Sequence, residues 1–288
     1  MLVAHISDFH VVPPPELYYG RLDTRASLAR ALDRIQSLSP RPDLIVGSGD
    51  LVDKPSAEAY AALREVLAGL DIPLRLIPGN HDDRRLLAEA FPDHPYLAAE
   101  AVDFTADCGA FRLVAFDAVV AGKEYARPSA EGLAWLAAAL GAEPSRPVML
   151  VMHHPPIDTA MDFVDAFQGG WSPEFLALIR ANPQVRLILC GHAHRPIEGA
   201  IGATRVSAAG STAHQFVLST DFATPPSMVF EPPMLRLHYW RDGEVVSHLI
   251  PIETGYETQM FKGVNAASWP ETATRLKARL ARARAGQA

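Results

Sequence analysis

The sequence predicts a layered α/β fold. Short apolar or β-branched runs alternate with longer segments whose apolar residues recur at helical spacing, a pattern typical of sheets covered by helices. Apolar residues make up 49% of the 288 residues and charged residues 20%, which is the composition of a folded globular protein. A chain of this length can bury a substantial core. The sequence has no internal repeat and no clear linker between two domains.

Six short apolar runs before Gly191 are predicted strands, and five segments among them are predicted helices. The strands cover 2–6, 44–48, 74–77, 113–116, 148–152 and 186–190. The helices cover 24–38, 56–70, 83–91, 129–140 and 173–181. Thr24 and Ser56 are suitable N-cap residues, and Ser172 precedes Pro173 at a first-turn position.

After Gly191 the pattern changes to strands, predicted at 205–209, 235–240 and 245–250. Asp242 and Gly243 give a hairpin turn between the last two. The stretch 224–233 carries four prolines, so it cannot be a regular central strand. It is either a lid or interface arm, or an ordinary surface connection. The tail, 271–288, is rich in Ala and Arg and is predicted to be a solvated helix or a frayed end.

Charge and cysteine content narrow the functional classes. The net charge of −7 and the pI near 5.9 argue against a nucleic-acid polymer as partner. A small anionic substrate would need local positive charge, which a bound dication supplies. Cys108 and Cys190 form no disulfide framework and are predicted to be thiols. The N-terminal residues show no targeting pattern, and no run reaches the ~20 apolar residues of a membrane span. We therefore expect a cytoplasmic protein with no membrane partner.

Five short polar segments each directly follow a predicted strand. They supply Asp8 and His10, then Asp50, then Asn80, His81 and Asp82, then His153, and finally His192 and His194. Open α/β sheets collect functional groups at the carboxyl ends of their strands, so one sheet edge is expected to hold all five segments. In an extended Asp-x-His the two side chains point the same way and can bind one ion, and His192 and His194 repeat this spacing. Carboxylate, imidazole and amide oxygen together favour Mn, Fe, Zn or Co.

Each segment alone has a simpler structural explanation. A single His is more often a packed or hydrogen-bonded residue than a ligand, and Asp50 or Asn80 alone would be an ordinary turn or cap residue. All five segments in this order, each at the end of a strand, favour a metal site instead. Asp50 is the candidate for a carboxylate that bridges two ions, and the glycines at 49, 79 and 191 are expected to let the backbone turn sharply beside the ligands.

In this order the five segments resemble those of the calcineurin-like metallophosphoesterase family, over roughly residues 1 to 210. The resemblance implies a four-layer αββα sandwich with two metals, divalent or mixed-valence transition ions. It assigns Asp8, His10, Asp50 and His194 to the first metal. It assigns Asp50, Asn80, His153 and His192 to the second. Residues 1–252 would form the catalytic domain, with a Pro-rich arm or lid at about 214–233, and 253–288 would form a C-terminal extension.

Within the family, the segments around Asp8, Tyr19, Asn80 and His153 are similar to the bacterial cyclic-nucleotide and glycerophosphodiester phosphodiesterases. Purple acid phosphatases differ, because they have a metal-binding Tyr where this chain has Asp53. The resemblance implies a small phosphodiester substrate and a homo-oligomer, a dimer or larger. The alternatives are a phosphomonoesterase or nuclease with the same site and, from another class, a metal-bearing interaction scaffold without catalysis.

The expected reaction is in-line attack on phosphorus by a metal-bound hydroxide. His81 is expected to bind the phosphoryl group or protonate the leaving alkoxide, and Asp82 to orient the His81 ring. Asn80, His81 and Asp82 are thus the candidate catalytic residues. Arg84, Arg85 and Arg195 are the cations nearest the five segments. His214 is a further candidate for the mouth of the site.

Overall fold

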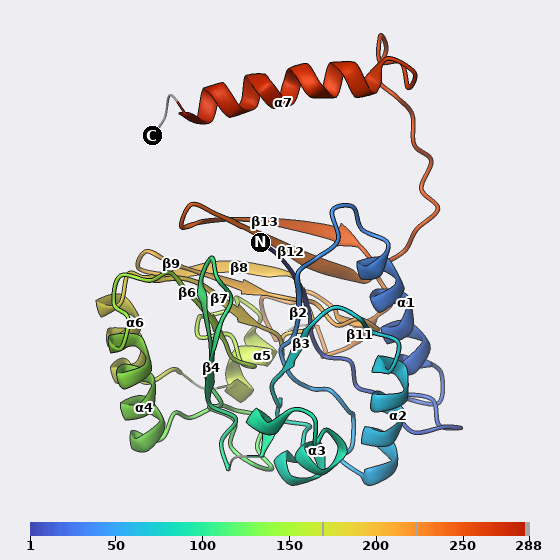
Figure 1. Cartoon of the computed structure of the whole chain (residues 1–288). Coiled ribbons are helices and arrows are strands. Elements are labelled where there is room, and N and C mark those ends of the chain that lie inside the picture. Colours follow the sequence, from blue (N-terminus) through green and yellow to red (C-terminus); the bar gives the residue numbers. More distant parts are fainter. Residues whose placement is uncertain (99, 169, 223, 286–288) are drawn as a thin grey trace. The chain divides into compact units, whose positions relative to one another are not determined.

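The computed structural model describes residues 1–98, 100–168, 170–222 and 224–285. Its contacts divide the chain into two compact units, Met1–Glu253 and Thr254–Ala288. The first unit contains two large sheets with helices on their outer faces (Figure 1). The described part of the second unit contains one helix, α7 (Trp269–Ala285). No helix among the described residues is long and apolar enough to cross a membrane.

The first sheet has five strands in the order β13-β12-β1-β2-β3. Its strands are β1 (Leu2–Ile6), β2 (Leu44–Gly47), β3 (Leu74–Leu76), β12 (Met234–Arg241) and β13 (Glu244–Pro251). Strands β1, β2 and β3 are parallel, whereas β12 runs antiparallel to β1 and β13 antiparallel to β12. The β12–β13 hairpin turns at Asp242 and Gly243, both with positive φ, which confirms the predicted turn.

The second sheet has six strands in the order β4-β5-β6-β7-β9-β8. Its strands are β4 (Phe104–Asp107), β5 (Arg112–Ala115), β6 (Val148–Val151), β7 (Val185–Cys190), β8 (Ile197–Ile201) and β9 (Thr204–Ala208). The four inner strands are parallel, and the edge strands β4 and β8 are antiparallel to their neighbours. The short strands β10 (Gln215–Phe216) and β11 (Met228–Val229) form a separate pair. The sequence pattern did not predict β4, β8, β10 or β11.

Helices cover the outer face of each sheet. On the first sheet they are α1 (Thr24–Gln36), α2 (Ala57–Leu67) and α3 (Arg84–Ala90), with a short 3-10 turn at Pro95–Leu97, and on the second sheet α4 (Ala130–Gly141) and α6 (Pro173–Ala181). The helix α5 (Asp162–Gln168) belongs to neither group and packs with Ala193 and Phe216. Serine side chains cap α2, α4 and α6 as N-caps. The prediction of Thr24 as an N-cap is wrong: Asp23 caps α1, and the Thr24 hydroxyl accepts a hydrogen bond from the Val12 N–H at 3.3 Å.

Alternate residues along the strands divide the core into layers, because successive side chains of a strand point to opposite faces. Ala4 and Ile45 pack with the residues of α1 and α2. Val3 and Val46 pack instead with residues of the second sheet such as Met149. On the far side, alternate residues of the second sheet pack with α4 and α6. The order of layers is therefore helices, sheet, sheet, helices, which confirms the expected αββα sandwich.

Candidate metal centre

The predicted site residues lie together at one end of the sandwich, but they come from both sheets. Asp8, Asp50 and Asn80 follow β1, β2 and β3, whereas His153 and His192 follow β6 and β7. The expectation that one sheet edge holds all five segments is therefore wrong. Packing the two sheets face to face aligns the carboxyl ends of their parallel strands, and this alignment brings the two sets of side chains into contact.

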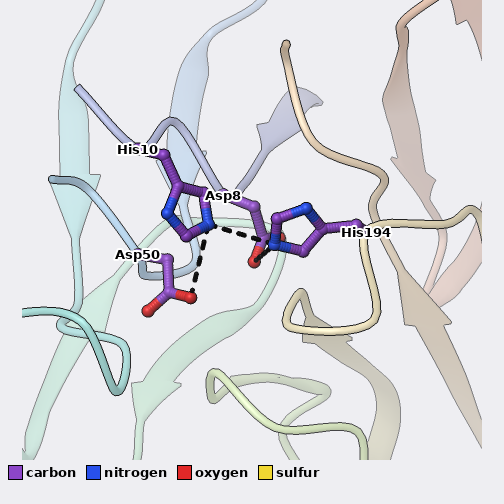
Figure 2. Close-up of side chains that lie close together, drawn as sticks. All are labelled: Asp8, His10, Asp50 and His194. Carbon is purple, nitrogen blue, oxygen red and sulfur yellow. Dashed lines mark hydrogen bonds and ion pairs between the residues drawn. The ribbon is translucent and has the colours of Figure 1, made fainter. Parts of the chain in front are cut away.

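The first cluster consists of Asp8, His10, Asp50 and His194, all almost completely buried (Figure 2). Nε2 of His10 lies 3.0 Å from Nε2 of His194 and 3.6 Å from Oδ2 of Asp50. Nε2 of His194 lies 3.4 Å from Oδ1 of Asp8. Two imidazole nitrogens and two carboxylates thus converge on one point, a donor set that suits a divalent transition metal.

The second cluster shares Asp50 with the first. Nε2 of His153 lies 3.3 Å from Oδ1 of Asp50 and 3.1 Å from Oδ1 of Asn80. Nδ1 of His192 lies 3.0 Å from the same Asn80 oxygen. Asp50 therefore presents Oδ2 to the first cluster and Oδ1 to the second, the arrangement needed for a carboxylate that serves two cations.

Burial gives the two clusters unusual protonation properties. Burial raises the pKa of Asp8 to about 6 and lowers the pKa of His192 to about 3. The pKa of His194 falls well below its ordinary value, again chiefly through burial. For His153 burial opposes the charged form, but Asp50 outweighs it and raises the pKa to about 9. A dication fits these side chains because it stabilises buried carboxylates and binds neutral imidazoles in place of protons.

The backbone at both clusters adopts the left-handed region that non-glycine residues rarely occupy. Such strain occurs mainly at functional sites. The residues concerned are Asp8 (φ 53°), His10 (φ 46°), Asp50 (φ 49°), His192 (φ 66°) and His194 (φ 49°). The Asp-x-His and His-x-His segments were expected to be extended, but they are not. Their side chains converge because each of these residues turns the chain.

Glycines beside the ligands allow close approach more than sharp turning. Only Gly49 of the three has a positive φ, at 105°. A Cβ on Gly79 would overlap the Asp50 carboxylate, and one on Gly191 would overlap Ser7 and Asp8. The expected role of the glycines as turning points is correct for Gly49, whereas at the other two positions the space is taken by ligand side chains.

Comparison with known proteins identifies the family. Residues 1–196 match the calcineurin-like phosphoesterase family. A glycerophosphodiester phosphodiesterase of Enterobacter lignolyticus is 32% identical over 241 residues, which are 83% of this chain and 86% of that protein. The chain belongs to the calcineurin-like phosphoesterase family. This confirms the resemblance seen in the sequence.

Two further comparisons agree with this family. A 3',5'-cyclic adenosine monophosphate phosphodiesterase of Pseudomonas aeruginosa is 28% identical over 239 residues, 83% of this chain and 86% of that protein. The crystal structure of a dimetal phosphatase from Danio rerio has the same fold, with a TM-score of 0.64 at 13% identity, over 88% of this chain and 96% of that chain. The family and the buried His and Asp clusters together support use of divalent metal.

In this calcineurin-like phosphoesterase, His81 adjoins both clusters without belonging to the predicted ligand sets. Its backbone N–H donates to Oδ1 of Asp50 at 2.9 Å, and its ring Nδ1 lies 2.8 Å from the carbonyl oxygen of Asp53. The prediction that Asp82 orients the His81 ring is wrong. The half-buried Asp82 carboxylate accepts hydrogen bonds from Gly79 N, Leu51 N and the Tyr60 hydroxyl, so it fixes the backbone of the loops.

Three residues near the phosphoesterase centre were missed by the sequence argument. Oδ1 of Asp53 lies 3.5 Å from Nδ1 of His10, so this carboxylate adjoins two histidines. Glu124 accepts a hydrogen bond from Nδ2 of Asn80 at 2.9 Å, which directs the Asn80 oxygen toward the second cluster. Ser211 donates to the carbonyl oxygen of Asp8 at 2.7 Å. The spacing Asp50-x-x-Asp53 was a visible signal, whereas Glu124 lies in a loop that has none.

A cavity of about 670 Å³ opens beside the first cluster of the phosphoesterase. His10, His81 and His194 line its inner end. The remaining wall is largely aromatic, and it includes Tyr18, Tyr19, Phe163, Phe216 and Phe230. The guanidinium of Arg21 lies 4.5 Å from the centre of the Phe230 ring. His214 does not reach the mouth as expected; it is completely buried and stacks on Tyr18.

The three candidate cations are engaged elsewhere in the phosphoesterase. Arg84 forms a two-pronged ion pair with Asp117, at 2.6 and 2.7 Å. Arg85 pairs with Glu89, and Arg195 pairs with Glu231. Among the described residues, Arg21 is the one basic side chain, Lys or Arg, that lines the cavity next to the histidines. Little side-chain positive charge is thus available for a phosphoryl group.

Proposed function

We propose that this phosphoesterase hydrolyses small phosphodiesters with two metal ions. The observation that carries the proposal is the position of Asp50, whose two oxygens face two separate ligand clusters. Asp8, His10, Asp50 and His194 would hold one ion. Asp50, Asn80, His153 and His192 would hold the other. The oxygen and nitrogen donors favour Mn, Fe, Zn or Co over softer ions.

The bound metals would neutralise charge on the phosphoryl oxygens and activate water. Protonation of the leaving group would fall to a side chain of the protein. His81 lines the cavity. Burial lowers its pKa, but Asp50 and Asp53 outweigh burial and raise the pKa above the ordinary value, which favours the protonated ring that a general acid needs. Because Asp53 engages Nδ1 of His81, Nε2 is left to give its proton to the leaving alkoxide.

The lining of the cavity supports a diester rather than a monoester. A monoester dianion usually needs additional cations, and the candidate arginines are paired with carboxylates. A diester carries one charge and has a second substituent to accommodate, for which the aromatic wall offers room. Relatives named as glycerophosphodiester and cyclic adenosine monophosphate phosphodiesterases support the same class. We therefore infer that cyclic nucleotides or glycerophosphodiesters are the substrates.

The organisation of the chain is part of the proposal. Residues 1–252 would be the catalytic domain and 253–288 an extension, with 214–233 acting as an arm at the site. Phe216, Met228 and Phe230 of this arm line the cavity, which favours a substrate-binding role over a simple connection. A cytoplasmic location and a homo-oligomer stay predictions.

Turnover of bis(4-nitrophenyl) phosphate and of 4-nitrophenyl phosphate tests the proposal. The enzyme is first loaded in turn with Mn, Zn, Co and Fe, and its metal content is measured. We expect a higher kcat/KM for the diester with two metals bound. A clear preference for the monoester would identify a phosphomonoesterase instead. If Asp50→Ala keeps both activities, the metal centre takes no part in the reaction. A panel of cyclic nucleotides and glycerophosphodiesters then identifies the substrate.

A further inference from the structure

The helix α7 of the second unit has a narrow apolar stripe. An α-helix turns once in about 3.6 residues, so residues spaced by three and four lie on one face. Such spacing aligns Trp269, Ala273, Leu276, Leu280 and Ala283 along α7. Leu276 and Leu280 are 47% and 48% exposed, so the other described residues of the second unit leave the stripe largely uncovered. A stripe of this kind usually requires an apolar surface against which to pack.

Cations flank the stripe on both sides. By helical spacing, Lys277 lies next to the stripe on one side and Arg279 on the other. Arg275 and Arg282 lie on the opposite face, where Arg275 pairs with Glu271 at 2.9 Å. Long basic side chains beside an apolar face can lay their stems along it and extend their charges to a polar boundary. This pattern is typical of helices that lie in the plane of a membrane interface.

Charge is distributed unevenly between the two units. Residues 254–288 carry six Lys and Arg and two Glu, a net charge of +4. Since the whole chain has a net charge of −7, residues 1–253 carry −11. The basic residues are thus concentrated on the segment that bears the apolar stripe. That concentration is complementary to a surface that is both anionic and apolar.

The segment before α7 adds further apolar side chains. Tyr256, Met260 and Phe261 are exposed, Phe261 at 86%. Trp269 begins the helix and is partly exposed. Aromatic side chains with polar and apolar parts are enriched at the boundary between water and lipid.

We propose that residues 254–285 bind the surface of a membrane rich in anionic lipids, with α7 lying in the plane of the interface. For this segment the proposal differs from the sequence-based expectation of no membrane partner. A second α7 is a poorer partner, because pairing two such stripes would bring Lys277 and Arg279 of one helix against the cations of the other. This proposal is independent of the proposed function, because binding to lipid is measured without substrate.

The first unit of a second copy is acidic but offers little apolar surface. Its exposed large apolar side chains lie mainly in the segments that also line the cavities, around Tyr19, Phe167 and Phe230. The exceptions among the described residues are Leu218 and Phe222 in the arm and Val246 and Leu249 on β13. Neither pair of side chains matches the length of the stripe on α7, whereas the acyl boundary of a membrane accepts all of it.

The test is flotation of the full chain with vesicles. One set contains phosphatidylcholine with about 30 mol % phosphatidylglycerol, and the other contains phosphatidylcholine alone. We expect the chain to float with the anionic vesicles, and its partition constant to fall about tenfold or more without the anionic lipid or in high salt. Equal binding to both vesicle types, or no binding to the anionic ones, would overturn the proposal.

Two variants separate the stripe from overall charge. Leu276→Glu puts a carboxylate into the stripe, and Ala278→Glu puts the same charge on the opposite face. We expect Leu276→Glu to lower the partition constant about tenfold or more relative to Ala278→Glu, with phosphodiesterase activity in solution unchanged in both. Equal losses in the two variants would reject burial of the stripe in lipid.

Sedimentation velocity of the chain without vesicles tests the competing occupant. If the stripe were covered by a second copy, Leu276→Glu would dissociate an oligomer that Ala278→Glu leaves intact, and anionic vesicles would not bind the wild-type chain. That combination of results would assign the stripe to self-association and overturn the lipid proposal. An unchanged sedimentation coefficient together with loss of flotation in Leu276→Glu supports it.

Discussion

Oδ1 of Asp50 lies 3.3 Å from Nε2 of His153, although the two residues follow strands of different sheets of the sandwich. On its other side, Asp50 presents Oδ2 to His10. A single carboxylate thus joins both ligand clusters, and several expected results depend on it.

Asp50→Ala should remove both metals, whereas Asn80→Ala should lower occupancy of the second alone. Asp50 faces both clusters, but the side-chain oxygen of Asn80 faces the second cluster, where it contacts His153 and His192. Metal content measured by mass spectrometry after gel filtration checks the difference, together with kcat. Asp93→Ala, at an exposed ion pair with Arg64, is the control and should keep full occupancy. Two metals retained in Asp50→Ala would refute the bridging assignment.

His81→Ala should reduce kcat by about 10²- to 10⁴-fold for alkyl leaving groups while both metals stay bound. The reason is that an alkoxide needs a proton on departure, whereas 4-nitrophenoxide leaves readily without one. Rates with a glycerophosphodiester and with bis(4-nitrophenyl) phosphate should therefore diverge in the variant. An equal loss for both substrates would show that His81 does not protonate the leaving group.

Phe230→Ala should raise KM several-fold for a cyclic nucleotide and leave kcat largely unchanged. Phe230 lines the cavity and lies beneath the Arg21 guanidinium, so its loss removes aromatic contact area from the bound substrate. Phe222→Ala is the matched control, since Phe222 is exposed and is absent from the lining of the described cavities. If both variants behave alike, the arm does not select the substrate.

Lowering the pH should destabilise the fold through His238. Burial, assisted by Arg236, lowers the pKa of this histidine to about 3, against an ordinary value of 6.5. Between these values the unfolded chain binds a proton that the folded chain does not, so stability falls as pH drops from 6.5 toward 3. Urea unfolding of the metal-free protein at several pH values measures this slope.

His238→Gln should reduce that slope, because glutamine does not titrate and can replace the hydrogen bond to Ser247 at 2.8 Å. His5 also has a pKa well below its ordinary value and will keep part of the slope. A variant with the full wild-type slope would mean that His238 is protonated in the folded state.

Chelation should lower the melting temperature by roughly 5 to 10 °C when metal is present at about a hundred times its dissociation constant. Ligands from both sheets meet at the centre, so a bound ion stabilises the folded state alone. Differential scanning calorimetry with and without chelator measures the shift. Asp50→Ala should show almost none, and an equal shift in that variant would place the stabilising metal elsewhere.

Much of the site was predictable because its residue types are tied to strand ends. Asp8, Asp50 and His153 were found from short motifs after apolar runs, and the structure places them together. The role of Asp82 was not predictable, since adjacency to His81 in sequence says nothing about which loop its carboxylate contacts. Glu124 was missed because only tertiary packing brings its loop to Asn80.

The fold was predictable to a similar extent. Central strands such as β1 and β7 are apolar runs bounded by polar residues, and pattern alone located them. The edge strands β4 and β8 alternate in burial and contain polar or small residues, so they resemble loops in sequence. That the site uses two sheets rather than one depends on how the sheets face each other, which no local pattern encodes.

Because the ligands come from both sheets, catalytic activity also shows whether the two sheets have packed together. Neither half of the chain can build the centre alone, because residues up to Asn80 supply some of the donors and residues after Met152 supply the others. In a refolding experiment, hydrolysis should therefore return only after the two halves have docked, later than the recovery of secondary structure.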